Sequence, residues 1–173
     1  FEDLIAMNAL YRPGPLEYIP NFVARKHGRE KISYDIPAME EYLGETYGIT
    51  VYQEQVMEAA RIIAGYTLGG ADILRRAMGK KKKEVMDQQR ERFLKGAVER
   101  GYPKEKIEKI FDLMAQFAGY GFNKSHSAAY AVLAYQTAYL KAHYGEEFLT
   151  AILNSAGNDT ERVAFFVQEA ERM

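Results

Sequence analysis

The chain has 173 residues, of which 47% are hydrophobic and 27% are charged, and its formal net charge is −1. This length and composition suit one well-packed core with room for a small satellite subdomain. With no cysteine and only three histidines, the sequence excludes disulfides and thiolate metal sites and disfavours a multi-histidine metal site. No apolar run reaches membrane-spanning length and no signal peptide is visible, so we expect a cytoplasmic protein with no membrane partner.

Charge is segregated along the chain. The segment from Asp72 to Arg100 contains ten basic and five acidic residues, a net charge of +5. The segment from Asp35 to Arg61 contains six acidic residues and one basic residue, a net charge of −5. Such segregation concerns partners rather than fold. We therefore expect the basic segment to face a polyanion and the acidic segment to face elsewhere.

The first third of the chain changes from turns to a helix. Residues 1–35 contain turn-forming residues and show no regular hydrophobic period. Within them, Tyr11-Arg12-Pro13-Gly14-Pro15 predicts a stiff turn because each proline fixes its own φ. Thr50 at the N-cap and Gln53 three residues later predict a capping box. The helix that they open is expected to run to about residue 64 and to end at Gly65.

Three further helices are expected before residue 119. Gly69-Gly70 precedes a short helix that Gly79 is expected to end, and residues 84–100 form an amphipathic helix that Gly101 ends. Pro103 suits the first position of the next helix. The inward stripe predicted for that helix is Ile107, Ile110, Phe111, Met114 and Phe117.

The last third is also helical. Ala128 to Tyr144 is apolar nearly all round, which predicts a buried central helix. Another helix begins near Glu146, and Asn158-Asp159-Thr160 caps a last one. With no convincing strand or repeat, the predicted fold class is all-α, an irregular helical domain around a buried central helix. We divide it into a turn-rich segment (1–35), a helical core (36–158) and the start of a truncated helical segment (159–173).

The segment from Gly119 to Tyr130 has the strongest chemical pattern. Two glycines precede the polar cluster Asn123, Lys124, Ser125, His126 and Ser127, and a long helix follows at once. Glycines admit close backbone approach, and a helix N-terminus offers N–H groups and a positive dipole end. This combination predicts an anion site, for phosphate above all, although it lacks the lysine spacing of a P-loop. The cluster also suits an elaborate helix cap, which does not exclude ligand binding.

A second basic motif lies in the short helix after Gly69-Gly70. Arg75 and Arg76 precede Lys80 by about one turn. Because adjacent helical side chains point about 100° apart, we expect that both arginines cannot face one carboxylate. A planar, always-charged guanidinium suits phosphate oxygens, and the alternative is a solvated face with surface ion pairs. The run Lys80 to Lys83 is either solvated surface or a patch for a nucleic-acid backbone.

Two aromatic residues and one absence complete the pattern. Tyr130 and Tyr135 could stack on a base, although core packing suits Tyr135 better on a helix expected to be buried. The chain contains no Asp-x-Asp pair for Mg²⁺ and no paired carboxylates beside the phosphate-binding motifs. We therefore expect a chain that holds a phosphate but cannot perform two-metal chemistry alone.

Several long motifs resemble one protein family. The resemblance lies in Ala6–Pro15, Tyr47–Met57, Ala64–Lys81 and Phe117–Tyr130. These segments are similar, in the same order, to bacterial replicative DNA polymerases of family C, specifically to the fingers domain of the DNA polymerase III α subunit. The match spans nearly the whole chain, which starts at Phe1, so we expect a piece excised from a larger protein. Residues 1–35 would then connect a palm to the fingers.

The resemblance implies a function for two motifs. It implies dNTP-binding residues at Arg75, Arg76, Asn123, Lys124, Ser125 and His126. From their residue types and positions we add Lys80 and Tyr130 to the expected nucleotide-binding residues, and Lys81, Lys82 and Lys83 as an expected contact with primer–template DNA, because the family pattern does not cover the lysine run. The family's Mg²⁺ ligands lie in the palm, upstream of this chain, so no catalytic or metal-binding residue is expected here and the fragment alone should be inactive. The sliding clamp and clamp loader would bind mostly outside it.

Two other functions remain open. One is a self-contained helical nucleic-acid-binding module with a Lys/Arg face and no nucleotide pocket. The other is a protein-interaction domain whose acidic segment, residues 35–61, docks a partner. Salt-dependent binding to DNA of any sequence would favour the first. Tight binding to a protein, without DNA or nucleotide affinity, would favour the second.

Overall fold

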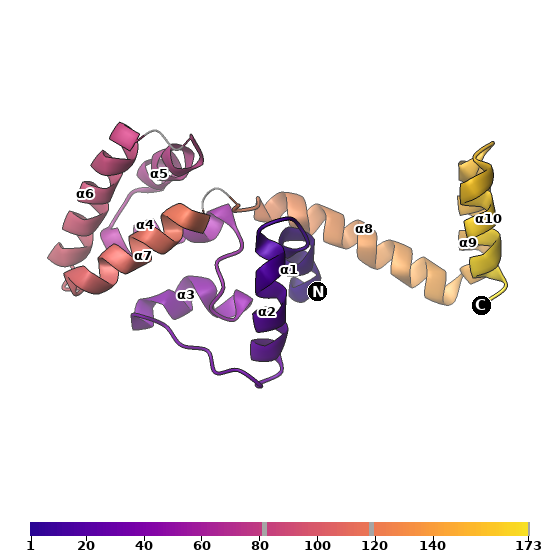
Figure 1. The fold of residues 1–173 in the computed structure, drawn as a ribbon, viewed down its shortest axis with the longest axis horizontal. Helices are drawn as coiled ribbons and strands as arrows, with labels where there is room; N and C mark the ends of the chain where they lie inside the picture. Colours follow the sequence, from indigo (N-terminus) through magenta and orange to yellow (C-terminus); the bar gives the residue numbers. More distant parts are fainter. Residues whose placement is uncertain (81–82, 118–119, 173) are drawn as a thin grey trace. The chain divides into compact units, whose positions relative to one another are not determined.

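A computed structural model describes residues 1–80, 83–117 and 120–172, without the side chains of Lys80 and Lys83 (Figure 1). Its α-helices are α1 (Glu2–Leu10), α2 (Ile19–Lys26), α3 (Glu40–Leu43), α4 (Gln53–Ala64), α5 (Leu68–Lys80), α6 (Lys83–Glu99), α7 (Lys104–Phe117), α8 (Lys124–His143), α9 (Gly145–Ala156) and α10 (Thr160–Ala170). Three 3₁₀ turns are η1 (Pro15–Tyr18), η2 (Pro37–Met39) and η3 (Gly44–Thr46). Within those ranges the extended pairing is confined to an isolated parallel bridge, so the predicted all-α class is confirmed.

The chain forms two units, residues 1–128 and 129–173. The first unit contains α1 to α7 and the first turn of α8, and the second contains the rest of α8 with α9 and α10. The predicted division at residues 35 and 158 stays a prediction.

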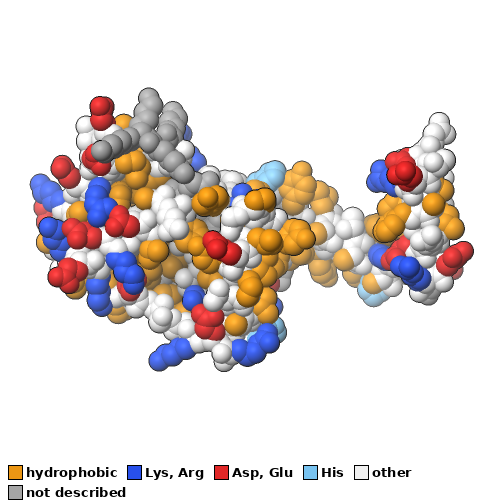
Figure 2. All heavy atoms as spheres, in the orientation of Figure 1, with side chains coloured by type: hydrophobic (Ala, Val, Ile, Leu, Met, Phe, Trp, Pro, Cys, Tyr) orange, Lys and Arg blue, Asp and Glu red, His pale blue; other side chains and the backbone are white. Residues whose placement is uncertain are grey.

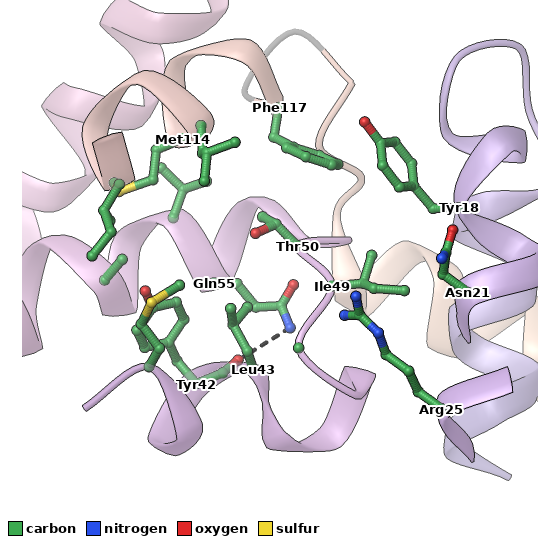
Figure 3. A pocket seen from close by; sticks show the side chains of 16 residues that line it. Tyr18, Asn21, Arg25, Tyr42, Leu43, Ile49, Thr50, Gln55, Met114 and Phe117 are labelled. Carbon is green, nitrogen blue, oxygen red and sulfur yellow. Dashed lines mark hydrogen bonds between the residues drawn. The ribbon is translucent and has the colours of Figure 1, made fainter. Parts of the chain in front are cut away.

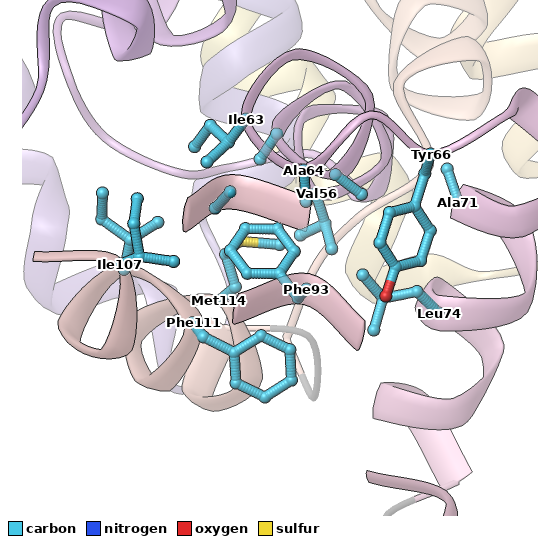
Figure 4. Packing of buried hydrophobic residues seen from close by; sticks show 14 of the residues in the cluster. Val56, Ile63, Ala64, Tyr66, Ala71, Leu74, Phe93, Ile107, Phe111 and Met114 are labelled. Carbon is cyan, nitrogen blue, oxygen red and sulfur yellow. The ribbon is translucent and has the colours of Figure 1, made fainter. Parts of the chain in front are cut away.

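The core of the first unit lies among α4, α5, α6 and α7 (Figure 4). Phe93 of α6 lies in it, with its ring centroid 5.4 Å from that of Phe111 on α7 and 6.4 Å from that of Tyr66. The predicted inward stripe of α7 is confirmed by the burial of Ile107, Ile110, Phe111 and Met114. Phe117 is half-buried, and its ring packs 5.0 Å from that of Tyr18.

Helix α4 is the most buried helix of this core. Its inward stripe is Val56, Ala59, Ala60, Ile63 and Ala64, at the spacing of one helical face. Gly96 of α6 lies directly against the end of this helix, because a Cβ added there would lie 2.2 Å from the carbonyl oxygen of Ala64. Small residues on both sides therefore let the two backbones approach closely. Gly65, with φ +69°, ends α4 as predicted.

The predicted capping box at Thr50 is wrong. Helix α4 begins at Gln53, and Gln55 turns back instead, its Oε1 accepting hydrogen bonds from the N–H groups of Val51 at 2.7 Å and Tyr52 at 2.9 Å. The Gln53 side chain is engaged elsewhere, because its Nε2 donates to the carbonyl oxygen of Gly121. By sequence spacing alone, either Gln53 or Gln55 could turn back to the start of the helix. Gln53 instead contacts Gly121, and Gln55 accepts the hydrogen bonds from the start of α4.

The prediction that Ala128 to Tyr144 forms a buried central helix is also wrong. The segment lies in α8 as a helix, but many of its large apolar side chains are exposed: Tyr130, Val132, Leu133, Tyr135, Tyr139 and Leu140. An apolar pattern on all faces leads to burial only where other elements cover those faces. In the described residues the central, covered helix is α4.

The second unit is locally well capped. Helices α9 and α10 pack against each other. Asp159 caps α10 as predicted, with its Oδ1 accepting a hydrogen bond from the N–H of Arg162 at 3.1 Å. Lys141 near the end of α8 forms an ion pair with Glu169 of α10. In the described part of the chain, no helix has the length and apolar character needed to cross a membrane.

Candidate anion-binding site

The polar cluster at residues 123–127 forms the start of α8. The Asn123 side chain accepts a hydrogen bond from the N–H of His126 at 2.8 Å, so the predicted cap is present. Ser125 and His126 are exposed, and the His126 ring packs edge-on to Phe122 with centroids 5.4 Å apart. Ser127 is buried instead, and its hydroxyl donates to the carbonyl oxygen of Ile5 at 2.6 Å. The cluster therefore divides into an exposed part and a structural part.

Glu54 of α4 occupies the N-terminus of α8. Its two carboxylate oxygens accept from the N–H of Lys124 at 3.1 and 3.0 Å, and Oε1 also accepts from the Asn123 amide at 2.9 Å. A helix N-terminus attracts negative charge, so a carboxylate stabilises it. Sequence reasoning missed this role, because Glu54 stands in a polar helix start, Tyr52 to Gln55, whose distant partner no local pattern identifies.

The Lys124 side chain points toward the acidic segment. Its Nζ lies 2.6 Å from a carboxylate oxygen of Glu45 and 5.5 Å from the centroid of the Tyr52 ring. Burial, followed by the charges of Glu45 and Glu54, raises the pKa of Tyr52. The expectation that the basic segment faces a polyanion and the acidic segment faces elsewhere stays a prediction. The acidic segment does contact the start of α8, because Glu45 and Glu54 bind Lys124 at sequence separations of 79 and 70 residues.

Arg75 and Arg76 of α5 share one carboxylate. Asp72 Oδ1 accepts from Arg75 Nη2 at 2.7 Å and Nε at 3.0 Å, while Oδ2 lies 2.8 Å from Arg76 Nε. The expectation that adjacent arginines cannot face one carboxylate is wrong, because Asp72 precedes them by three and four residues and their long side chains curve back toward it. The Arg75 side chain is 29% exposed and that of Arg76 is 67% exposed.

Gln53 connects the two basic motifs. Its Oε1 accepts from Arg75 Nη1 at 2.9 Å, and its Nε2 donates to the carbonyl oxygen of Gly121 at 3.0 Å. The backbone supports this contact through the parallel bridge of Tyr52 and Phe122, in which the Gln53 N–H donates to the Phe122 carbonyl at 2.9 Å. Motifs nearly fifty residues apart therefore meet at the start of α4.

The N-terminal turn also contacts the segment before α8. The Arg12 guanidinium lies 4.4 Å from the centroid of the Phe122 ring and donates to the carbonyl oxygen of Tyr120 at 2.6 Å. Gly14, with φ +97°, lies against the Tyr120 ring, where an added Cβ would come within 2.9 Å. The predicted stiff turn thus has a partner, which the sequence pattern did not identify.

The remaining predicted residues lie outside the described residues or in the second unit. Lys81 and Lys82 lie outside the described residues, as do the side chains of Lys80 at the end of α5 and Lys83 at the start of α6. Tyr130 is exposed and belongs to the second unit. Figure 2 shows basic and acidic side chains interspersed among the coloured residues on the visible face of the first unit.

A cavity of about 360 Å³ lies apart from these motifs, between α2, α4 and α7 (Figure 3). Tyr18, Ile49, Met114 and Phe117 line it, and the dashed line marks the hydrogen bond from Gln55 to the carbonyl oxygen of Tyr42. Its one basic side chain, Arg25, is paired with Glu30 at 2.8 Å. Among the predicted nucleotide-binding residues whose side chains are described, none lines this cavity, and its mostly apolar wall does not suit a phosphate.

The side chains that could bind a metal ion are dispersed over the described residues. In residues 1–80, 83–117 and 120–172, no group of three or more His, Asp or Glu side chains is placed to hold a metal ion. The carboxylates nearest the basic motifs, Glu45, Glu54 and Asp72, are each engaged by cations or N–H groups. These residues do not fit a catalytic Mg²⁺ site.

Comparison with known proteins identifies the family. The family described as "Bacterial DNA polymerase III alpha subunit finger domain" matches residues 1–101. Proteins named DNA polymerase III subunit alpha from Borreliella burgdorferi, Thermus aquaticus and Chlamydia pneumoniae are 55%, 54% and 55% identical to the chain, over 98%, 99% and 100% of its length. The chain spans only 15%, 14% and 14% of these relatives. It therefore belongs to the family of bacterial DNA polymerase III alpha subunit finger domains.

Proposed function

We propose that this chain is the part of a DNA-directed DNA polymerase that binds the triphosphate of the incoming dNTP. It helps to position the nucleotide over primer–template DNA during replication of a bacterial chromosome, in the cytoplasm. The residues proposed to face the nucleotide are Arg75, Arg76, Lys80, Asn123, Lys124, Ser125, His126 and Tyr130. The run Lys81, Lys82 and Lys83 is proposed to contact the DNA backbone.

One observation supports this proposal most directly. Arg75 and Arg76 converge on a single carboxylate, each taking one oxygen of Asp72. A phosphate presents oxygens in a similar spacing and carries more negative charge, so it can replace that carboxylate as the shared acceptor. The exposure of Arg76 leaves a solvent route to this pair.

The chemistry itself is assigned to regions outside this chain. The described donor set does not fit a divalent cation. We propose, from the family resemblance, that Mg²⁺ is bound by carboxylates of a palm domain in the whole polymerase. The fragment alone is therefore expected to support no primer extension. The sliding clamp and clamp loader are proposed partners of the whole polymerase through other regions.

The test uses the full-length polymerase subunit that contains this chain. Arg76→Ala should lower kcat/KM for nucleotide about 10- to 150-fold, the equivalent of losing a charge-assisted hydrogen bond of about 1.5–3 kcal/mol. If the contact strengthens as the leaving pyrophosphate gains charge, kcat takes part of the loss. Arg76→Lys should recover only part of it, because an ammonium cannot reproduce the bidentate fork.

The control is Arg61→Ala on α4. Arg61 also forms a surface ion pair three residues from its partner, Glu58, and its side chain is 45% exposed. It should leave nucleotide kinetics unchanged. Unchanged kcat/KM in the alanine variants of Arg75, Arg76 and Lys124 would refute the proposed function. A loss confined to DNA affinity would favour a nucleic-acid-binding module instead.

A further inference from the structure

Gln53 uses both ends of its side-chain amide to join two elements. The oxygen accepts from Arg75 on α5 at 2.9 Å, and the nitrogen donates to Gly121, just before α8, at 3.0 Å. An uncharged amide is suited to this task, because it offers an acceptor and a donor in one plane. A carboxylate would lack the donor, and an ammonium would lack the acceptor.

The surroundings of Gln53 leave it little freedom. Its backbone N–H donates to Phe122 at 2.9 Å, so the residue is attached to the Gly121–Phe122 segment at two points. A Cβ added to Gly121 would lie 3.1 Å from Gln53 Cγ, which shows how closely the segment approaches. A side chain at position 121 would therefore crowd Gln53, and the contact depends on a side chain of this length at position 53.

Gln53 also distinguishes the two arginines. The Arg75 guanidinium is fixed from two sides, by Asp72 on its own helix and by Gln53 on α4. Arg76 pairs with Asp72 and is more than twice as exposed. The geometry thus makes Arg75 the preorganised member of the pair, at a defined position relative to the segment that leads into α8.

We infer that Gln53 is a positioning residue for nucleotide binding: it sets the position of Arg75 relative to the Gly121–Lys124 segment, so that one triphosphate can contact both motifs. This inference rests on the proposed function. Gln53 itself need not touch the nucleotide, and it acts by restricting the arginine and the segment before a ligand arrives.

The experiment uses the full-length polymerase subunit with dNTP, Mg²⁺ and saturating primer–template. Gln53→Met removes both hydrogen-bonding groups at nearly constant volume, and Gln53→Glu keeps the acceptor for Arg75 but loses the donor to Gly121. Gln88→Met, at an exposed position on α6, is the matched control for the chemical change. Nucleotide KM and kcat, primer–template Kd and melting temperature are measured, together with the double variant of Gln53→Met and Arg75→Ala.

We expect Gln53→Met to raise nucleotide KM about tenfold, the scale of one or two hydrogen bonds, with primer–template Kd and melting temperature close to those of the control. In the Arg75→Ala variant, adding Gln53→Met should raise nucleotide KM about threefold or less, because the guanidinium that Gln53 positions is absent. Gln53→Glu should remain defective, because positioning needs both ends of the amide.

The outcomes separate the inference from the proposed function. Two results would overturn the positioning inference while the proposed function stands, provided that Arg75→Ala impairs nucleotide use. In the first, Gln53→Met leaves nucleotide KM unchanged. In the second, Gln53→Met raises nucleotide KM as much in the Arg75→Ala variant as in the wild type. Wild-type kinetics in Gln53→Glu would also overturn the positioning inference. A lower melting temperature combined with additive costs would show a structural link only. If no basic variant affects nucleotide use, the proposed function itself fails.

Discussion

Glu54 binds the backbone N–H of Lys124 with both of its carboxylate oxygens, at 3.1 and 3.0 Å. The negative charge thus lies at the positive end of the α8 dipole, where it also accepts from the Asn123 side chain. A phosphate that approaches the start of α8 must share these donors with a resident carboxylate or displace it. The helix N-terminus is therefore a capped junction with α4 in this structure, and Lys124 offers its side chain from a position already paired with Glu45.

Removing the Glu54 carboxylate should destabilise the first unit. Glu54→Ala should lower the free energy of unfolding by about 1–2 kcal/mol, since it removes a helix cap and a favourable charge–dipole interaction. Glu54→Gln should lower the free energy of unfolding by a smaller amount, because an amide oxygen can still accept a hydrogen bond from the N–H of Lys124. Urea unfolding of the 173-residue chain, followed by circular dichroism, measures both. Glu41→Ala, an exposed glutamate of α3, is the control, and equal midpoints for Glu54→Ala and this control would refute the capping role.

Asp72 should give the chain an acid-sensitive component of stability. Hydrogen bonds from Arg75, followed by the charge of Arg76, hold the pKa of Asp72 below its ordinary value. A carboxyl whose pKa is lower in the folded state contributes stability above its unfolded pKa of about 4, and this contribution is lost as the pH falls through the folded value. Asp72→Asn should therefore reduce the urea midpoint at pH 7 and have a progressively smaller effect below about pH 4.

Asp87→Asn is the control for removing a surface carboxylate. Asp87 is exposed on α6, so Asp87→Asn should lower the urea midpoint at pH 7 less than Asp72→Asn does. A difference between wild type and Asp72→Asn that stays constant from pH 7 to pH 3 would contradict the ion pair as its source.

Gly96 should tolerate no side chain. Because an added Cβ would lie 2.2 Å from the carbonyl oxygen of Ala64, Gly96→Ala must push α6 away from α4. We expect a loss of about 1–3 kcal/mol or more in the free energy of unfolding, as for other overpacked cores. Gly79→Ala on α5 is the matched control, since no atom of the described residues lies within 4 Å of its added Cβ, and it should be neutral or stabilising by up to about 1 kcal/mol. Equal stability of the two variants in urea would contradict the close approach.

Binding of the isolated chain to duplex DNA should be weak, independent of sequence and strongly salt-dependent. The basic segment offers charge without groups arranged to read bases, and each neutralised phosphate adds about −0.9 to the slope of log K against log salt. With about three or four contacts, the slope should be near −3. Fluorescence anisotropy over a salt series measures it, and changing Lys81, Lys82 and Lys83 to alanine should flatten it. A slope near zero in the unaltered chain would show that the lysine run does not meet DNA.

Local features of this fold could be predicted from sequence, because their causes lie within a few residues. The end of α4 at Gly65, the end of α6 near Gly101 and the Asp159 cap of α10 each depend on one turn of chain. The buried stripe of α7 follows from its periodicity in the same way.

The connections between helices could not be predicted. Glu54 meets Lys124 across 70 residues, and Gln53 meets Gly121 across 68, so no local pattern pairs them. The failed prediction for α8 has the same origin: composition shows which side chains are apolar, whereas burial depends on which elements cover them. Composition predicts sites at the two basic motifs, and those sites stay predictions, whereas the counter-ions of the motifs and their link through Gln53 are visible only in the tertiary structure.

The shared carboxylate of Asp72 has a kinetic consequence. Arg75, Arg76 and Asp72 together present a local charge of +1 rather than two bare guanidinium groups, and Glu45 offsets Lys124 in the same manner. A nucleotide further away than the Debye length of about 8 Å at physiological ionic strength is therefore drawn only weakly toward these motifs. Its rate of encounter is set mainly by diffusion. Under the proposed function, strong attraction would begin at contact, when phosphate oxygens exchange with the carboxylate, so these motifs would favour selection at short range over long-range capture of any passing anion.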